Sequence, residues 1–217
     1  RSKVYGLALN NPDYAGSITG VIAGDNITVT RASTGGVATA TVAGSPYPIV
    51  GTLADPAGKL ANYTVSNPNG VLTVTKALLT IAAVNKSKTV GTAYTFDMTT
   101  PSSDFTVTGL VLSDAVTSIT LTSAGAAAGA TVAGSPYPII PSVAVGTGLG
   151  NYAITYTNGG FTIIPKALTI AAVNKSKTYG TAYTFDMTTP SSDFTVTGLI
   201  LGNTVTSITL TSAGSTA

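Results

Sequence analysis

The chain has no cysteine, no histidine and no tryptophan, and all of its acidic residues are aspartates. The absence of cysteine excludes disulfide bonds and thiolate metal sites. The absence of both histidine and cysteine excludes the usual nucleophilic triads and imidazole-based acid–base catalysis. We therefore expect no enzymatic activity, no catalytic residues and no cofactor.

Charge is also scarce, because only 8% of the residues are charged and the net charge is +2. The ten Lys and Arg residues are scattered in ones and twos, so no patch would neutralise a row of phosphates, and we expect no nucleic-acid partner. We interpret the pairs Lys86/Lys88 and Lys175/Lys177 as solvated faces that discourage edge-to-edge strand pairing. No apolar run approaches the roughly 20 residues that cross a bilayer, so we expect no direct membrane insertion of this segment.

The eight aspartates are spread singly along the chain. Asp97, Asp104 or Asp114 could hold calcium together with loop carbonyls, but the clustered Asp-x-Asp pattern of calcium sites is missing. We therefore interpret the aspartates as residues that cap turns and keep the surface solvated, and we predict no metal site.

The chain is rich in small and aliphatic residues: 44% of it is hydrophobic, and Gly and Thr are abundant. This composition favours strands separated by turns. Leu168, Ile170 and Ala172 alternate with Thr169 and Ala171, which is the period of a half-buried strand. The sequence therefore predicts an all-β protein, built of antiparallel β-sandwiches with immunoglobulin-like, Greek-key connections and without helices.

The most informative feature is internal repetition. Residues 166–214 repeat residues 76–125 almost letter for letter, with one inserted Leu and five substitutions. The sequence AGSPYPI, at 43–49 and again at 133–139, extends the same period of about 90 residues back towards the start. A near-copy of a whole domain multiplies length or valency, whereas an enzyme gathers unlike residues at one site.

Aligning the copies predicts the domain organisation. Repeat one covers residues 1–75 and lacks its first strand, because Arg1 aligns with Lys86, immediately after the KALTIAAVN-type segment that opens the other repeats. Repeat two, residues 76–165, is complete. Repeat three, residues 166–217, is an incomplete first part.

The repeats follow one another without a linker. The predicted strand at 161–164 runs directly into residues 165–168, and no Gly/Ser tract separates them. We therefore expect repeats joined end to end into a stiff rod, each adding on the order of 30–40 Å.

These residues carry a family resemblance. The segment KALTIAAVNKSKTYG, the turn at Gly198-Leu199, the Gly-x-x-Tyr-x-Ile element at 134–139 and the segment NYAITYTNGGFTIIPKA resemble the MBG ("mostly beta, glycine-rich") domain. Repeat one also has the Asn-Pro-x-Tyr element at 11–14, which repeats two and three replace. The resemblance implies tandem immunoglobulin-like modules of large bacterial surface proteins, exported to the extracellular face of the cell.

Two weak site candidates follow from the residues. Tyr47 and Tyr137 are each held between two prolines and could stack against a sugar or an apolar partner, although a core lid is the commoner role. Lys88 or Lys177 could form an internal isopeptide cross-link with a late-strand asparagine such as Asn151. Lysines and asparagines at strand ends are, however, usually only solvated.

Three functions are compatible with the sequence. The first is a mechanical spacer or stalk, or the repeat region of a fibre, in a cell-adhesion protein. The second is a self-assembling filament subunit, in which a neighbour's strand fills the place of the strand missing before Arg1 by donor-strand exchange. The third is a carbohydrate- or protein-binding adhesin module. The expected partners are neighbouring copies of the same repeat and other chains in a fibre.

Overall fold

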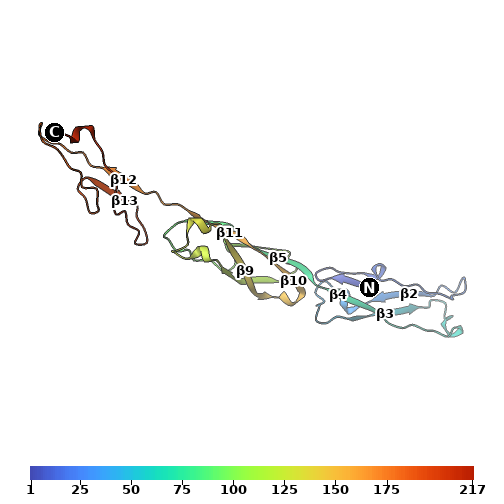
Figure 1. Cartoon of the computed structure of the whole chain (residues 1–217). Coiled ribbons are helices and arrows are strands. Elements are labelled where there is room, and N and C mark those ends of the chain that lie inside the picture. The colour runs from blue at the N-terminus through green and yellow to red at the C-terminus, as the bar shows by residue number, and fades with distance from the viewer. The chain divides into compact units, whose positions relative to one another are not determined.

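The computed structural model describes residues 1–217 and consists of 13 β-strands connected by loops and seven short 3₁₀ turns, without an α-helix (Figure 1). None of the helical turns has the length and apolar character that spanning a membrane requires. The all-β prediction is therefore confirmed. The 3₁₀ turns are η1 (Asn11–Asp13), η2 (Thr34–Gly36), η3 (Leu60–Asn62), η4 (Ala124–Ala126), η5 (Val132–Gly134), η6 (Leu149–Asn151) and η7 (Ala213–Ser215).

Contacts divide the chain into two compact units, whose boundaries pass through repeat two. The first unit comprises Arg1–Val84, Asp97–Leu121 and Ile140–Gly159. The second comprises Asn85–Phe96, Thr122–Ile139 and Gly160–Ala217.

In the first unit, repeat one forms a four-stranded sheet with the strand order β1-β4-β3-β2. Its strands are β1 (Ser2–Val4), β2 (Thr28–Ala32), β3 (Tyr47–Ala54) and β4 (Gly70–Thr75). A small core of Tyr14, Ile49 and Leu72 packs beneath this sheet, with Leu9 and Tyr47 at its margin. Leu72 is fully buried because it lies on the inward-facing alternation of β4.

The first unit also contains a three-stranded sheet of repeat two with the order β10-β5-β7. Its strands are β5 (Ala77–Ala83), β7 (Phe105–Thr108) and β10 (Tyr152–Thr157). The central strand β5 shows the predicted alternation, since Leu79 and Ile81 are buried while Leu78 is 76% exposed. Strand β5 runs parallel to β10 and antiparallel to β7.

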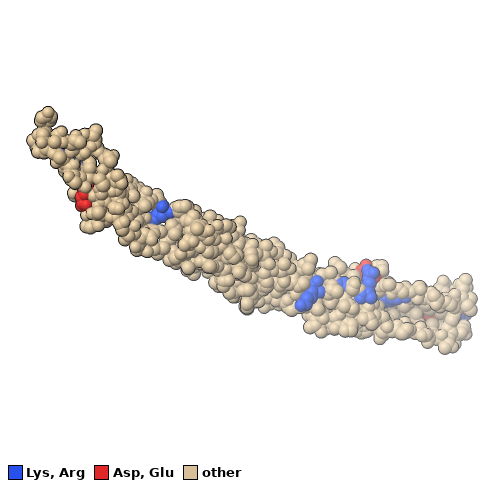
Figure 2. Space-filling view, viewed as in Figure 1, with Lys and Arg blue, Asp and Glu red and all other residues tan.

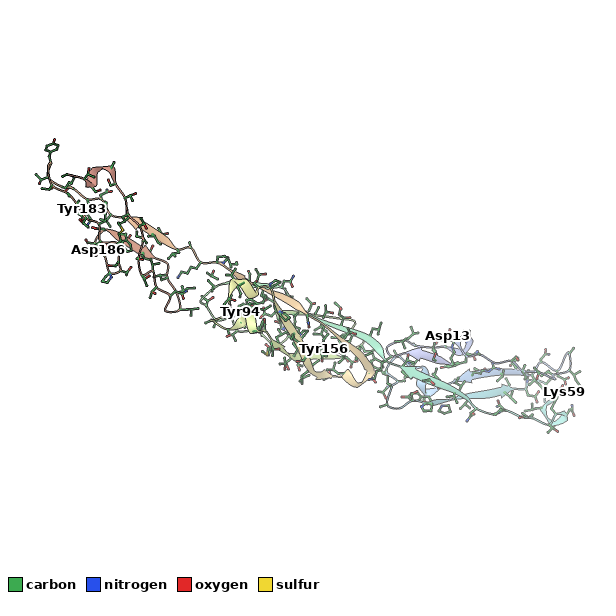
Figure 3. All side chains as sticks on the ribbon, viewed as in Figure 1. Asp13, Lys59, Tyr94, Tyr156, Tyr183 and Asp186 are labelled. Atoms are coloured by element: carbon green, nitrogen blue, oxygen red, sulfur yellow. The ribbon has the colours of Figure 1, made fainter.

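A further sheet of repeat two has the order β6-β11-β9-β8. Its strands are β6 (Lys86–Thr89), β8 (Ala115–Thr122), β9 (Tyr137–Thr147) and β11 (Gly159–Ile164). In the second unit, the ring of Phe161 on β11 is completely buried and packs edge-on against Tyr94, which is labelled in Figure 3, and against Phe96. These three rings form the aromatic core at this end of repeat two.

Repeat three forms only a two-stranded antiparallel pair, β12 (Thr169–Ala172) with β13 (Phe194–Thr197). The register matches that of β5 with β7: Ile170 lies opposite Val196, as Ile81 lies opposite Val107. The near-identical sequences therefore form the same hairpin-like pair in both repeats.

The sequence had predicted antiparallel sheets, but the sheets are mixed. Three pairs are parallel: β1 with β4, β5 with β10, and β6 with β11. In each pair, an early strand of a repeat lies beside a late strand of the same repeat. Such pairs are joined by long connections rather than by hairpins, and this is the condition under which parallel pairing is possible.

Neighbouring leucines on β5 provide a test of this sandwich. We expect Leu79→Ala to lower the free energy of unfolding by about 2–5 kcal/mol, because it opens a cavity in the core. The matched control Leu78→Ala, on the exposed face, should change it by less than about 0.5 kcal/mol. Urea denaturation followed by circular dichroism measures both. Equal losses in the two variants would contradict the assigned faces of β5.

Candidate functional site

The most distinctive polar site is a buried lysine on β6. The side chain of Lys88 is only 8% exposed, and its ammonium group donates hydrogen bonds to three main-chain carbonyl oxygens. The acceptors are Thr92 O at 2.6 Å, Ala126 O at 3.0 Å and Ala127 O at 2.5 Å. The ammonium nitrogen also lies 5.8 Å from the centre of the Phe161 ring. Lys88 therefore ties the end of β6 to the turn η4.

Both other repeats contain the same arrangement. In repeat one, Lys3 donates to Leu7 O at 2.7 Å and to Val37 O at 2.5 Å, next to η2. In repeat three, Lys177 donates to Thr181 O at 2.6 Å and also to Thr216 O, next to η7. A lysine at the same sequence position thus binds the corresponding pair of loops in every repeat, which indicates a structural role. Lys3 and Lys88 lie on strands and are buried, whereas Lys177 lies outside a strand and is exposed.

The local sequence explains why a cation is accommodated there. Each acceptor turn begins with a serine whose hydroxyl accepts from the glycine two residues later, as Ser123 does from Gly125 at 3.2 Å. Gly125 lies against the Tyr137 and Phe161 side chains, and an added Cβ would come within about 3.1 Å of them. The turn is thereby held close to the core with its carbonyls free to accept from the lysine. Burial lowers the pKa of both Lys3 and Lys88, because it penalises the charged form.

This burial corrects the interpretation of Lys86/Lys88 as a solvated pair, because Lys88 points inward. Interpreting every aspartate as a surface residue was also wrong, because Asp104 and Asp193 are each only 2% exposed. The signal in the sequence was the recurrence of one lysine at the same position of all three repeats. Short-range patterns alone do not distinguish such a lysine from a solvated one.

A second polar cluster is centred on Asp193 in repeat three. Its carboxylate forms an ion pair with Lys175 at 2.8 Å, accepts from the Tyr183 hydroxyl at 2.7 Å and accepts from the Asp186 amide at 2.7 Å. Tyr183 and Asp186 are labelled in Figure 3. The Lys175 ammonium, more than the other two donors, holds the pKa of the Asp193 carboxyl well below its usual range.

A third cluster recurs in repeats one and two and involves a tyrosine hydroxyl. Tyr152 accepts from the Val111 amide at 3.0 Å and donates to Asp114 at 2.7 Å. Tyr63 likewise accepts from the Ile22 amide at 3.0 Å and donates to Asp25 at 2.5 Å. These matching bonds identify Tyr63 as the counterpart of Tyr152. A hydrogen bond to the neighbouring carboxylate raises the pKa of both tyrosines, although burial has the larger effect at Tyr152.

The two tyrosines suggested as ligand platforms make contacts inside their own repeats. The hydroxyl of Tyr137 donates to Thr131 O at 3.2 Å, and that of Tyr47 donates to Thr41 O at 3.0 Å. Both rings are half-buried. A binding role for Tyr47 and Tyr137 stays a prediction.

The groups suggested for a covalent cross-link also have hydrogen-bond partners. Lys88 and Lys177 donate to carbonyl oxygens, as described, and the side-chain oxygen of Asn151 accepts from the Val42 amide at 3.0 Å. The cross-link stays a prediction that an intact mass decides.

The three aspartates that the sequence offers as calcium ligands each make a different local hydrogen bond. Asp97 accepts from Thr99, Asp104 accepts from the Asp97 amide, and Asp114 accepts from Tyr152. No three His, Cys, Asp or Glu side chains gather where they could hold a metal ion.

Comparison with known families accounts for this recurring set of turns and strands. A family model described as "MBG domain (YGX type)" matches residues 1–73 and again residues 79–162. The chain belongs to the MBG domain family. Its two matched segments agree with the tandem MBG repeats expected from the sequence. Neither the comparison with curated proteins nor that with solved structures finds a match.

The buried lysine of the MBG repeat gives a stability prediction. We expect Lys88→Met to lower the free energy of unfolding by about 1–3 kcal/mol, because it leaves buried carbonyl oxygens without a donor. The control Lys76→Met, at an exposed position, should have an effect below about 0.5 kcal/mol. Urea denaturation measures both variants. A Lys88→Met variant as stable as the control would show that the carbonyls do not depend on the ammonium.

The Asp193 cluster gives a pH prediction. Because the folded-state pKa of Asp193 is depressed, its contribution to stability is present above the pKa of the unfolded chain, about 4, and is lost as the pH falls towards the folded value. A carboxyl-detected NMR titration should find Asp193 still ionised at pH 3. In Asp193→Asn, the decrease in melting temperature between pH 4 and pH 2 should be smaller than in the natural chain. An ordinary pKa for Asp193 would contradict the cluster.

Proposed function

We propose that this chain is a mechanical spacer, the stalk-forming repeat region of a bacterial extracellular surface protein. The observation that carries the proposal is the direct connection between repeats. Strand β4 ends at Thr75 and β5 begins at Ala77, so that a single residue, Lys76, joins repeat one to repeat two. A connection of one residue leaves little freedom for a hinge, in contrast to a Gly/Ser linker.

Side-chain contacts at the junctions support the proposal. Within the first unit, the ring of Tyr5 of repeat one packs edge-on against that of Tyr152 of repeat two, with centroids 5.7 Å apart. The Asn151 oxygen accepts from the Val42 amide in the same region. Within the second unit, Gly91 of repeat two lies against Ile200 of repeat three, where an added Cβ would approach the Ile200 side chain to 3.0 Å. Packed side chains at a junction resist bending better than a solvated linker.

The distribution of charge is compatible with a passive role. Figure 2 shows few charged side chains on the visible face, and most of them, basic with an acidic one beside them, lie over repeat one. A chain with only 8% charged residues and a net charge of +2 offers little for electrostatic recognition of a ligand. The family also supports the proposal, because MBG repeats resemble the stalk modules of large surface proteins.

A distance measurement tests the stiffness. Because the natural chain has no cysteine, spin labels can be placed uniquely at Lys59→Cys and Ala153→Cys, in repeats one and two. We expect a single narrow distance distribution by double electron–electron resonance. Inserting Gly-Gly-Ser-Gly-Gly-Ser after Lys76 should broaden it markedly. If the natural chain already gave a distribution as broad as that of the insertion variant, it would be a flexible tether, and the proposed spacer role would fail.

The proposed location is tested in the native host. Limited protease treatment of intact cells should remove the antibody signal for this chain while an internal marker protein stays intact. A chain that is digested only after cell lysis would contradict an extracellular stalk.

A further inference from the structure

A single residue links β10 to β11 in repeat two. Strand β10 ends at Thr157 and β11 begins at Gly159, so that Asn158 alone lies between them. The two strands belong to different sheets, because β10 pairs with β5 and β11 lies between β6 and β9. The chain therefore passes from one sheet of repeat two to the other through the main chain of one asparagine.

The side chain of Asn158 is exposed and makes no hydrogen bond. Two other asparagines of repeat two are held in place. The Asn85 side-chain oxygen accepts from the Gly160 amide at 2.7 Å, and that of Asn151 accepts from the Val42 amide at 3.0 Å. No contact of this kind fixes Asn158, so its side chain is free to turn towards the main chain that follows it.

The residue after Asn158 favours a reaction between side chain and main chain. Gly159 has no side chain to obstruct the approach of its main-chain nitrogen to the Cγ atom of Asn158. The chain has one other Asn-Gly sequence, Asn69-Gly70 in repeat one, and every other asparagine precedes a residue with a side chain. The two Asn-Gly sequences stand at equivalent positions, three residues before the fully buried Leu72 or Phe161.

We propose that Asn158 is a modification site, at which the asparagine converts without an enzyme into aspartate and isoaspartate. The main-chain nitrogen of Gly159 bonds to Cγ of Asn158, and the bond from Cγ to the side-chain nitrogen breaks. The leaving nitrogen takes the proton of the Gly159 amide and departs as ammonia, which leaves a cyclic imide. One water then opens the imide: cleavage of the new bond gives aspartate, and cleavage of the original peptide bond gives isoaspartate.

The two products differ in their effect on the repeat. Both exchange a neutral amide for a carboxylate and so add one negative charge. Isoaspartate also carries the main chain through Cβ and Cγ, which inserts one additional atom between β10 and β11. The chain beyond this point has little room to shift, because a Cβ added to Gly159 would come within 2.8 Å of the Ala83 oxygen and the Gly160 amide is bound to Asn85. Isoaspartate therefore strains the link, and this consequence holds whether or not the chain is a spacer.

Peptide mapping tests the site in the folded chain. We expect incubation of the 217-residue chain at 37 °C and pH 8 to convert Asn158 into both isomers, which chymotryptic digestion and electron-transfer fragmentation distinguish. Asn151 is the matched control in the same sample and should stay intact, because its side chain is held and Tyr152 follows it. An Asn158 that stays intact while the free peptide of residues 155–162 reacts would overturn the site. Aspartate without isoaspartate would overturn the cyclic imide.

Melting temperatures test the effect of the longer main chain. All chains in this experiment carry Asn69→Gln, so that the second Asn-Gly sequence does not react. In this background, we expect the melting temperature to fall in proportion to the isoaspartate content during incubation. Adding Asn158→Gln should keep the melting temperature constant, because a glutamine has to close a larger and more slowly formed ring. An equal fall in the Asn158→Gln variant would overturn the link between the site and the loss of stability.

A charge control separates the two products. Asn158→Asp carries the added negative charge on an ordinary main chain, so a fresh sample should melt like the chain that keeps Asn158 and has not been incubated. A fresh Asn158→Asp sample that melts as low as the incubated chain would show that the charge causes the loss, and would overturn the strain at this link.

Discussion

The structure of the complete repeat depends on one constraint: its opening strand must lie between a strand that comes soon after it and one that comes much later. Strand β5 meets β7 about 25 residues on and β10 about 75 residues on. Because both edges of β5 are paired and one of its faces is fully buried, it closes the sandwich. In repeat one, residues 16–19 and 63–67, which correspond to parts of β7 and β10, are not strands. The local pairing of repeat three, by contrast, needs only neighbouring segments.

The buried lysine supplies hydrogen-bond donors to main-chain carbonyl oxygens of the loops around it. In repeats one and two, carbonyl oxygens in or next to the 3₁₀ turns η2 and η4 face the strand that carries the lysine, and these oxygens need donors once water is excluded. An ammonium group offers three donors on a flexible stem, so that one residue satisfies two loops. An arginine would place a planar fork in the same space and would not fit the converging carbonyls equally well. In a chain without cysteine, this contact fixes the two loops relative to the strand, as a disulfide often does in small domains.

The sequence predicted what depends on local periodicity and on repetition. The alternation along Leu79 and Ile81 predicted the buried face of β5. It did not predict the parallel pairing of β5 with β10, because alternation defines the faces of a strand but not its neighbours. It also misjudged Lys88, since two of the three acceptors of its ammonium group lie 38 and 39 residues away and no local pattern indicates them. The only indication in the sequence that this lysine has a structural role was its recurrence at the same position of each repeat.

The near-identity of the repeats makes pairing between copies a question of competition. The opening strands of repeats two and three have nearly the same sequence, so their side chains would pack almost equally well in either repeat. Side-chain packing alone therefore does little to select the strand of the same repeat. The covalent connection favours the strand of the same repeat. Strand β5 is joined to β6 by only Val84 and Asn85, which gives β5 a high effective concentration at its position between β7 and β10.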